Sequence, residues 1–522
     1  MQQKKLIHLF KRVAPIFLIG SFSFLINYHY GFIGLMPMDN TVLYNGGYRV
    51  LNGYVPFTDY WLVTGPLLDY LNALFFSILG VSWKTFIIHS SLINLLFGLA
   101  SYFLFIQLEL SKKFSIFYSI LMSVLFYPVV GTPFVDHHST FFLIIAFYIF
   151  IFSVYKKNYF SLIFIPLFFC LSFLSKQTPA AYGLLTILPL ISLLCFLDKK
   201  NIKNILINLL FGSAISLFLL VIFIFFTNID ISNFVEQYIF FAGSIGEYRL
   251  SNYDLNILDV LNKFKFIFFY IFILIIITIY LSYKKKINGN NLLVLIASLA
   301  ISLILIFHQF LTLNQNFIFF IIPFLCGITH IYYKKILEKK YLLIVLVSVC
   351  IFSVSKYHLR FNEDRKFNEL EGVDLSKAID AKVLSNEFKG LQWITYRYPD
   401  DPNRELNNLK QIIKILKNDS SKRMLITDYQ FLSPTLKTYD FSPNQWHHPT
   451  VSFPLNDQKY FKKYKNFFIK NLKDNNIDFI YETTENDKSI TELVINKDCL
   501  KKIRASEMLL KIKLLKNCKD LN

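Results

Sequence analysis

The chain has 522 residues, of which 54% are hydrophobic and 18% aromatic, and its formal net charge is +19. A soluble protein of this length cannot bury so much apolar surface, because a single hydrophobic core stops growing with chain length. The apolar residues also form long runs nearly free of charge, such as 205–226 and 266–279, which suit the hydrocarbon part of a bilayer. The composition therefore excludes a soluble globular protein and predicts a polytopic α-helical membrane protein.

The positive charge has a simple explanation in such a protein. Many of the lysines and arginines lie in short loops beside the apolar runs, and the others solvate a lysine-rich tail. The charge is therefore no sign of a nucleic-acid partner.

The apolar runs predict about eleven membrane-spanning helices. They cover residues 13–33, 84–109, 114–132, 139–155, 159–175, 179–197, 203–227, 263–283, 291–311, 316–332 and 341–356. The further apolar segment 66–82 is short and interrupted, and we expect it to form a helix in the membrane interface or a broken span. The transmembrane part of the chain is thus expected to occupy residues 1–356.

Positive charge differs between alternate loops, and this difference predicts the orientation of the helices. The loops on the side of the N-terminus carry eighteen lysines and arginines, and the loops on the other side carry six. Because the more basic loops lie in the cytoplasm, the N-terminus is expected inside, and an odd number of spans places the tail outside. We therefore expect a multi-pass protein with long outer loops at 34–83 and 228–262.

Residues 357–522 have the pattern of a small soluble, extracytoplasmic α/β domain. Short β-like runs occur in this tail at 391–396, 424–427 and 479–481, and helical patterns occur at 405–416 and 460–472.

Two of the six cysteines, Cys499 and Cys518, lie in the tail, and a helix-like segment rich in lysine and leucine separates them. An external compartment permits a disulfide between them, and closing a loop of about twenty residues would contribute roughly 3 kcal/mol. The other four cysteines lie in apolar runs and are expected to be packing residues. The spacing of the six fits no metal site.

The first outer loop holds the most informative polar residues of the chain. Asp39 lies just beyond the first span, and a helix that stops at an Asn-Gly pair follows it. Pro56 then fixes a turn that bears Asp59 among aromatic residues, and a Gly-Pro pair at 65–66 begins the next apolar segment.

This loop resembles that of bacterial GT-C glycosyltransferases, polytopic enzymes that use polyprenyl-phosphate-linked sugars. The superfamily includes relatives of protein mannosyltransferases and of lipid A aminoarabinose transferases. Its members carry an acidic residue at the start of the loop and then a segment of the form Arg-hydrophobic-Leu-x-Gly-x-x-Pro-Tyr-x-Asp-Phe. The matching residues of this chain are Asp39 for the acid and Arg49, Leu51, Gly53, Pro56, Phe57, Asp59 and Tyr60 for the segment.

The likeness covers residues 1–356 in outline, and the tail is comparable to the extra domain that many members carry. Many members have Asp-Glu where this chain has Asp39 and Asn40. A single carboxylate remains at this position, which weakens any claim that it binds a metal ion.

The resemblance implies an inverting glycosyltransferase of a bacterial inner membrane, which moves a sugar from a polyprenyl monophosphate to an acceptor on the outer face of that membrane. The acceptor would be a lipid, a glycan or a protein. A base must take the proton of the acceptor hydroxyl, and Asp39 is the candidate, although a solvated loop aspartate or a helix N-cap would give the same pattern. The donor carries its own leaving group, so no soluble cofactor is expected.

The departing phosphate needs cations or hydrogen-bond donors close to it. Lys176 and Gln177 stand at the outer end of the fifth predicted span, and they resemble the Lys-Gln element of the superfamily at that depth. Lys176 is therefore a candidate phosphate contact, although a lysine that snorkels to the interface would look the same.

Further polar residues are candidates for contact with sugar or phosphate. Arg249 in the second long loop could clamp a phosphate with its planar guanidinium, and a solvated loop explains it equally well. A polar group that includes His308, Gln315 and Asn316 interrupts the apolar stretch between two spans, where such residues line a cavity or pair with other helices. Asp59 is explained about equally by local turn chemistry and by acceptor binding.

Asp136, His137 and His138 follow the third predicted span. Such a group could bind a metal ion, contact phosphate or orient a base, or it could form a plain interfacial turn. Adjacent ligands do not easily share one tetrahedral ion, so we favour a polar contact to donor or acceptor and predict no metal.

Two other functions have sequences of similar outline. A flippase or transporter of lipid-linked sugars would show internal repeats and charged or broken helices at mid-membrane, whereas the polar residues here lie at the outer ends of spans. A polymerase or ligase of surface polysaccharide also has many spans and outer loops, but it would not need the pattern of the first loop.

Overall fold

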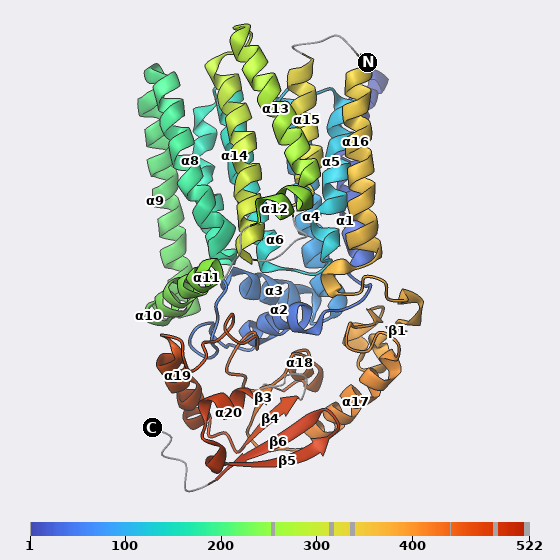
Figure 1. Cartoon of the computed structure of the whole chain (residues 1–522), viewed down its shortest axis with the longest axis vertical. Helices are drawn as coiled ribbons and strands as arrows, with labels where there is room; N and C mark the ends of the chain where they lie inside the picture. Colours follow the sequence, from blue (N-terminus) through green and yellow to red (C-terminus); the bar gives the residue numbers. More distant parts are fainter. Residues whose placement is uncertain are drawn as a thin grey trace. The chain divides into compact units, whose positions relative to one another are not determined.

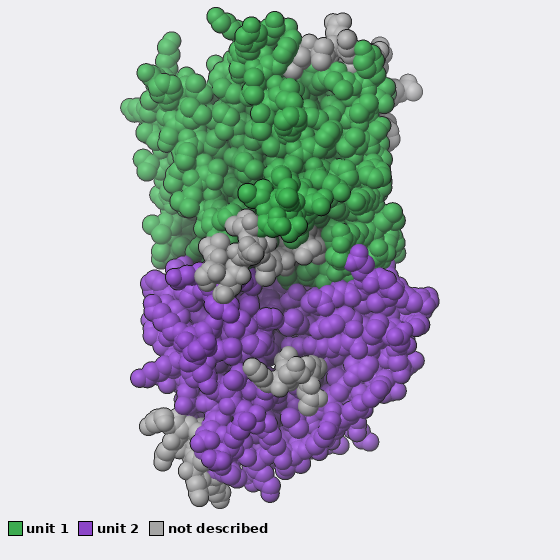
Figure 2. All heavy atoms as spheres, in the orientation of Figure 1, with its two compact units in different colours: residues 1–31, 90–223, 252–367 green, residues 32–89, 224–251, 368–522 purple. Residues whose placement is uncertain are grey.

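A computed structural model describes residues 2–251, 256–312, 318–334, 340–438, 440–483 and 489–515. The chain divides into two compact units, which Figure 2 shows in different colours. Unit 1 contains residues 1–31, 90–223 and 252–367, and unit 2 contains residues 32–89, 224–251 and 368–522.

Unit 1 is built almost entirely from helices, most of them long and apolar (Figure 1). They are α1 (Gln2–Tyr30), α4 (Trp83–Gln107), α5 (Lys112–Leu125), α6 (Val135–Lys156), α7 (Ile165–Ser175), α8 (Gln177–Leu197), α9 (Ile202–Thr227), α12 (Ile257–Lys263), α13 (Lys265–Tyr283), α14 (Gly289–Thr312), α15 (Ile321–Tyr333) and α16 (Lys340–His358).

Eight helical stretches of the described chain are long and apolar enough to cross a bilayer. They are Val13–Tyr30, Trp83–Gln107, Val135–Lys156, Gln177–Leu197, Lys199–Thr227, Lys265–Tyr283, Gly289–Thr312 and Tyr341–Asn368. The chain is thus a polytopic helical membrane protein. Each of the eleven predicted ranges contains a helix, but α5, α7 and α15 are shorter than the other eight, so a count of eleven spans stays a prediction.

Helix α6 forms much of the interior of unit 1. In the most apolar window of α6, 78% of the residues are buried inside the protein, whereas in that of Lys199–Thr227 the buried share is only 11%. Helices α7, α8 and α14 all pack against α6. Polar residues of α6 are therefore held among other helices, while α9 exposes apolar side chains as a lipid-facing helix does.

Unit 2 combines three segments that are far apart in the sequence. The first contributes α2 (Pro37–Leu51) and α3 (Leu67–Leu79), and the second contributes α10 (Ile231–Phe234), the π-helical turn η4 (Val235–Phe241) and α11 (Ala242–Ser251). The third holds α17 (Pro402–Asn418), α18 (Leu432–Leu436), α19 (Phe461–Asp474), α20 (Ile490–Val494), β1 (Ile379–Asp380), β2 (Gln392–Trp393), β3 (Arg423–Ile426), β4 (Phe479–Thr483), β5 (Leu500–Ser506) and β6 (Leu509–Leu514). The two predicted outer loops and most of the predicted tail therefore fold together.

A four-stranded mixed sheet organises the third segment, with strand order β3-β4-β6-β5. Strands β3 and β4 are parallel, with Met424 opposite Ile480, and the other pairs are antiparallel. Helix α17 begins at a proline and is capped by Asp401, whose side chain accepts from the Arg404 N–H. Its apolar residues recur at helical spacing and are buried, among them Leu409.

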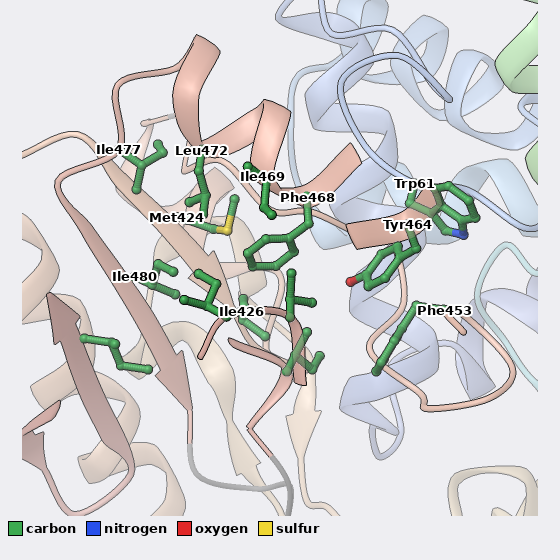
Figure 3. Packing of buried hydrophobic residues seen from close by; sticks show 14 of the residues in the cluster. Trp61, Met424, Ile426, Phe453, Tyr464, Phe468, Ile469, Leu472, Ile477 and Ile480 are labelled. Carbon is green, nitrogen blue, oxygen red and sulfur yellow. The ribbon is translucent and has the colours of Figure 1, made fainter. Parts of the chain in front are cut away.

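One hydrophobic core joins the three segments of unit 2 (Figure 3). The ring of Trp61, from the first segment, lies 5.6 Å from that of Phe241 in η4 and 5.4 Å from that of Tyr464 in α19. The backbone of Trp61 also donates to the Pro443 carbonyl at 2.8 Å and accepts from the Gln445 N–H at 3.0 Å. Both predicted outer loops thus share a core with the tail.

The prediction of a helix-like segment between Cys499 and Cys518 was wrong. Strands β5 and β6 form an antiparallel hairpin there, and Leu509 and Ile512 are buried in the unit. Lysine and leucine favour helices in isolation, but the pairing of β6 with β4 and the burial of Leu509 and Ile512 override that preference. Cys518 lies outside the described residues, so the disulfide stays a prediction.

Candidate functional site

Asp39 is the third residue of α2 and is half-buried. The N-cap position of this helix belongs to Met36, whose backbone N–H donates to Asn40 Oδ1 at 2.7 Å. Asp39 is therefore not the N-cap that the sequence allowed. A carboxylate in the first turn of a helix is favoured by the positive end of the helix dipole.

A cleft of about 680 Å³ lies in unit 2 beside this turn. Its lining comes from the start of α2 and from four places in the tail: Met38, Tyr396, Arg397, Tyr398, Asp428, His448, Pro449, Arg504, Glu507 and Met508. Met38 lines the cleft, and Asp39 follows it in the first turn of α2 without being part of the lining itself.

Hydrogen bonds fix the start of α2 to the wall of the cleft. The Thr41 hydroxyl is bonded to the Asp428 carbonyl oxygen at 2.8 Å and to the Gln430 N–H at 3.0 Å. The buried carboxylate of Asp428 also holds the guanidinium of Arg397 at 2.5 Å. The cation in the cleft and the helix that carries Asp39 are thus positioned by the same residue.

Asp69 in α3 is a buried carboxylate that the sequence interpretation missed. Its side chain accepts from the Tyr60 hydroxyl at 2.8 Å and from Gln445 Nε2 at 2.7 Å, and Arg49 lies over the Tyr60 ring, 4.8 Å from its centroid. Burial raises the pKa of Asp69 to about 7. A charged residue inside the apolar segment 66–82 was the signal that could have revealed it.

Two glycines let α2 and α3 approach each other around this carboxylate. A Cβ atom on Gly46 would lie 2.1 Å from Asp69 Oδ1, and one on Gly47 would lie 2.4 Å from Asn72 Cβ. No larger residue fits at either position without movement of the neighbouring helix.

Several residues that carry the GT-C resemblance hold the first loop in shape. Arg49 is buried, and its Nη1 donates to the Asn444 carbonyl at 3.3 Å. Asp59 Oδ2 accepts from the Val55 N–H at 2.7 Å, and burial raises the pKa of its carboxyl group. The turn interpretation of Asp59 therefore has a geometric basis, and acceptor binding by Asp59 stays a prediction.

Unit 1 brings together three polar residues that the sequence had placed in separate groups. Lys176 Nζ lies 2.7 Å from Asp136 Oδ1 and 2.8 Å from Oδ2, and His308 Nε2 lies 2.9 Å from Asp136 Oδ1. The Asp136 side chain is 2% exposed and the Lys176 side chain 18%. Asp136 belongs to the first turn of α6, Lys176 to the break between α7 and α8, and His308 to the last turns of α14.

The amide next to this cluster in sequence is also buried. Gln309 is 1% exposed, and neither its Nε2 nor its Oε1 has a hydrogen-bond partner among the residues that the structure describes. A buried amide of this kind is costly unless a ligand or water satisfies it.

His137 and His138 are fully buried and face other partners within unit 1. His137 Nε2 lies 3.1 Å from the Phe126 carbonyl oxygen, and His138 Nδ1 is hydrogen-bonded to the Tyr127 hydroxyl. These contacts give both histidines a place in the packing of α6 against the preceding segment. Contact with a phosphate by either histidine stays a prediction.

The remaining candidates are less informative. Gln177 begins α8 and is half-buried, and Arg249 lies in α11, also half-buried. Gln315 and Asn316 lie outside the described residues. In the described part of the chain, no three His, Cys, Asp or Glu side chains gather closely enough to hold a metal ion.

No protein-family model matches this chain, and no curated protein is significantly similar to it. The proposed function therefore rests on the start of α2 with its cleft, on the contacts of Asp136 with Lys176 and His308, and on the resemblance of the first loop to GT-C enzymes.

Proposed function

We propose that this protein is an inverting glycosyltransferase of GT-C type, which transfers a sugar from a polyprenyl-phosphate carrier to an acceptor on the extracytoplasmic face of a bacterial inner membrane. The observation that carries the proposal is that the carboxylate of Asp39 belongs to the first turn of α2, next in sequence to Met38, which lines a cleft. Two residues of the matched segment link that helix to α3, because the guanidinium of Arg49 lies over the Tyr60 ring and the Tyr60 hydroxyl donates to Asp69.

In the proposed reaction, an acceptor hydroxyl oxygen attacks the anomeric carbon of the donor. Asp39 takes the proton of that hydroxyl as the new carbon–oxygen bond forms. The bond between the anomeric carbon and the phosphate oxygen breaks, and the electron pair leaves with polyprenyl phosphate. Attack from the face opposite the leaving group inverts the anomeric centre.

The Asp136–Lys176–His308 cluster is the proposed contact for the phosphate. Lys176 is the partly exposed member, so its ammonium group can meet a ligand while Asp136 fixes its position. Positioned cations stabilise the charge that develops on a departing phosphate. The buried Gln309 amide supports a polar ligand at this end of α14.

The proposed topology has eleven spans, a cytoplasmic N-terminus and an extracytoplasmic C-terminal α/β domain. Support comes from the core of unit 2, since Trp61, Phe241 and Tyr464 belong to one cluster. A folded core cannot be divided between the two faces of a bilayer. Both long loops and the tail are therefore expected on one side, as the charge pattern of the loops predicts.

Transfer assays with Asp39→Asn test the proposed base. The purified full-length protein would be incubated with synthetic polyprenyl-phosphate sugars and cell-envelope acceptor extract. Loss of a general base lowers a rate by 10²–10⁴-fold, so we expect transfer to fall by at least about a hundredfold while donor binding is unchanged. Asp457→Asn, which neutralises an exposed carboxylate of the same unit, is the matched control. An Asp39→Asn protein that keeps more than about a tenth of the wild-type rate would refute the assignment.

The same assay separates the proposal from its rivals. A flippase would move lipid-linked sugar across vesicles without forming a new glycosidic bond. A polysaccharide polymerase or ligase would consume diphosphate-linked glycans and leave the monophosphate donor untouched.

A further inference from the structure

The cleft of unit 2 has the size of a ligand site. Its volume of about 680 Å³ falls within the range of roughly 300–1,000 Å³ that is usual for small-molecule sites. Its walls are anchored, because Asp428 is bonded both to Arg397 and, through its carbonyl oxygen, to Thr41. A preformed cleft loses little entropy when a ligand enters it.

The charges that line the cleft favour an anion. Of the two lining carboxylates, Asp428 is paired with Arg397, and Glu507 is paired with Arg404, which lies outside the lining. Arg504 is exposed, its Nη2 donates to the Glu507 carbonyl oxygen at 3.0 Å, and it forms no ion pair within the described chain. One guanidinium in the cleft is therefore not neutralised by a carboxylate.

Aromatic rings make up much of the remaining lining. Tyr396 and Tyr398 are half-buried on either side of Arg397, and the guanidinium of Arg397 lies 5.4 Å from the centroid of the Tyr396 ring. The hydroxyl of Tyr398 is bonded to Met508 Sδ at 3.5 Å, which fixes the second ring against the β5–β6 hairpin. Fixed rings beside polar groups suit a sugar, whose C–H faces pack on aromatic surfaces while its hydroxyls form hydrogen bonds.

From this lining we infer that the cleft is a binding site for an anionic saccharide, held by Arg504 and Arg397 and packed on Tyr396 and Tyr398. Because Met38 lines the cleft and Asp39 follows it in α2, this saccharide would be the acceptor. The acceptor role rests on the proposed function, whereas the binding itself does not.

Binding experiments without any donor test the inference. The full-length protein in nanodiscs of neutral lipid would be titrated with a hyaluronan tetrasaccharide, which carries uronate carboxylates, and with the neutral chitotetraose. We expect the acidic saccharide to bind at least about tenfold more tightly. Arg504→Gln should weaken that binding about tenfold, since a charge-assisted hydrogen bond is lost, and should leave binding of the neutral saccharide unchanged. Lys501→Gln, which removes a charge from the same strand outside the cleft, should have no effect.

Further measurements keep the test decisive. Arg397→Lys retains the positive charge that Asp428 needs but loses the planar guanidinium. Its tryptophan fluorescence should therefore show a folded protein, while its affinity for the acidic saccharide should be lower than that of the wild type. The inference would be overturned if neither saccharide bound, if both bound equally, if Lys501→Gln weakened binding as much as Arg504→Gln, or if inorganic phosphate competed as well as the acidic saccharide does. None of these results depends on turnover, so they are separate from a failure of the wild-type protein to use polyprenyl-phosphate sugars.

Discussion

The contact between Asp136 and Lys176 has two possible purposes, and a single substitution cannot separate them. Asp136 is 2% exposed, so its carboxylate needs a cation whatever else the pair does. Breaking a buried pair by removing one partner costs about 3–5 kcal/mol, because the other charge is left uncompensated. The remaining contact with His308 should keep the cost for Lys176→Gln toward the lower end of that range.

Combining Lys176→Gln with Asp136→Asn separates structure from ligand contact. Lys176→Gln alone should lower the thermal stability of the purified protein. Thermal stability is measured as the fraction of protein that still elutes as a single species in size-exclusion chromatography after heating. The double variant should recover most of that stability, because no unpaired charge remains. If Lys176 contacts the donor phosphate, binding of polyprenyl-phosphate sugar stays weakened by tenfold or more in the double variant. Full recovery of donor binding would assign Lys176 a structural role alone.

Asp69 predicts a dependence of stability on pH. Burial raises its pKa to about 7 in the folded protein, against about 3.9 in an unfolded chain. The folded state therefore binds the proton more tightly, and the stability that this proton gives is present below about pH 4 and lost as the pH rises through about 7. The unfolding midpoint of the wild type should fall over this range, and the fall should be smaller in Asp69→Asn. Since all four tryptophans belong to unit 2, their fluorescence reports on this unit. Parallel pH profiles for the two proteins would contradict the prediction.

At the scale of helices and strands, the close approach of α2 and α3 depends on a glycine. Gly46→Ala would place a methyl group 2.1 Å from Asp69 Oδ1 and 2.7 Å from Gln445 Nε2, so one of the helices must shift. Overpacking of this kind costs about 1–3 kcal/mol, which should lower the unfolding midpoint of unit 2 measured by tryptophan fluorescence. Gly243→Ala in α11 is the matched control, because nothing lies within 4 Å of its added Cβ, and it should be neutral or slightly stabilising. Equal unfolding midpoints for the two variants would show that α3 can shift to make room for the methyl group without a loss of stability.

The sequence predicted helices better than their associations. Apolar runs coincide with helices in all eleven predicted ranges, because a run long enough to meet lipid has few alternatives to helix. The strands β5 and β6 were missed, since the hairpin that they form joins the sheet through the pairing of β6 with β4, which is not its neighbour in the sequence. The meeting of Asp136 with Lys176 and His308 was also beyond prediction, although each residue had been singled out as polar within an apolar region.

At the scale of the whole chain, the core of unit 2 limits the number of spans. Residues 32–89, 224–251 and 368–522 share one unit, so the chain must cross the membrane an even number of times between each consecutive pair of these segments. The eight longest candidates place four crossings in the first interval and three in the second, and three is odd. Counting the buried helix α15 as a span makes the second number four, and adding α5 and α7 together keeps the first number even. Nine spans, without α5 and α7, and eleven spans, with both, satisfy this parity, and both counts place the N-terminus and the tail on opposite sides; the count of eleven stays a prediction.

Alkaline-phosphatase fusions test this topology in cells. Alkaline phosphatase is active only outside the cytoplasm, so a fusion at the C-terminus should be active, and fusions truncated after Lys157 or Lys285 should be inactive. Both lysines lie in the short basic loops expected inside, where positive charge resists translocation.

An epitope inserted at the exposed Gly53 should be reached by antibody in spheroplasts without permeabilisation, because the first segment of unit 2 shares its core with the tail. An active fusion at Lys157, or a Gly53 epitope seen only after permeabilisation, would place Asp39 on the cytoplasmic side and remove it from any reaction that uses an outward-facing polyprenyl-phosphate donor.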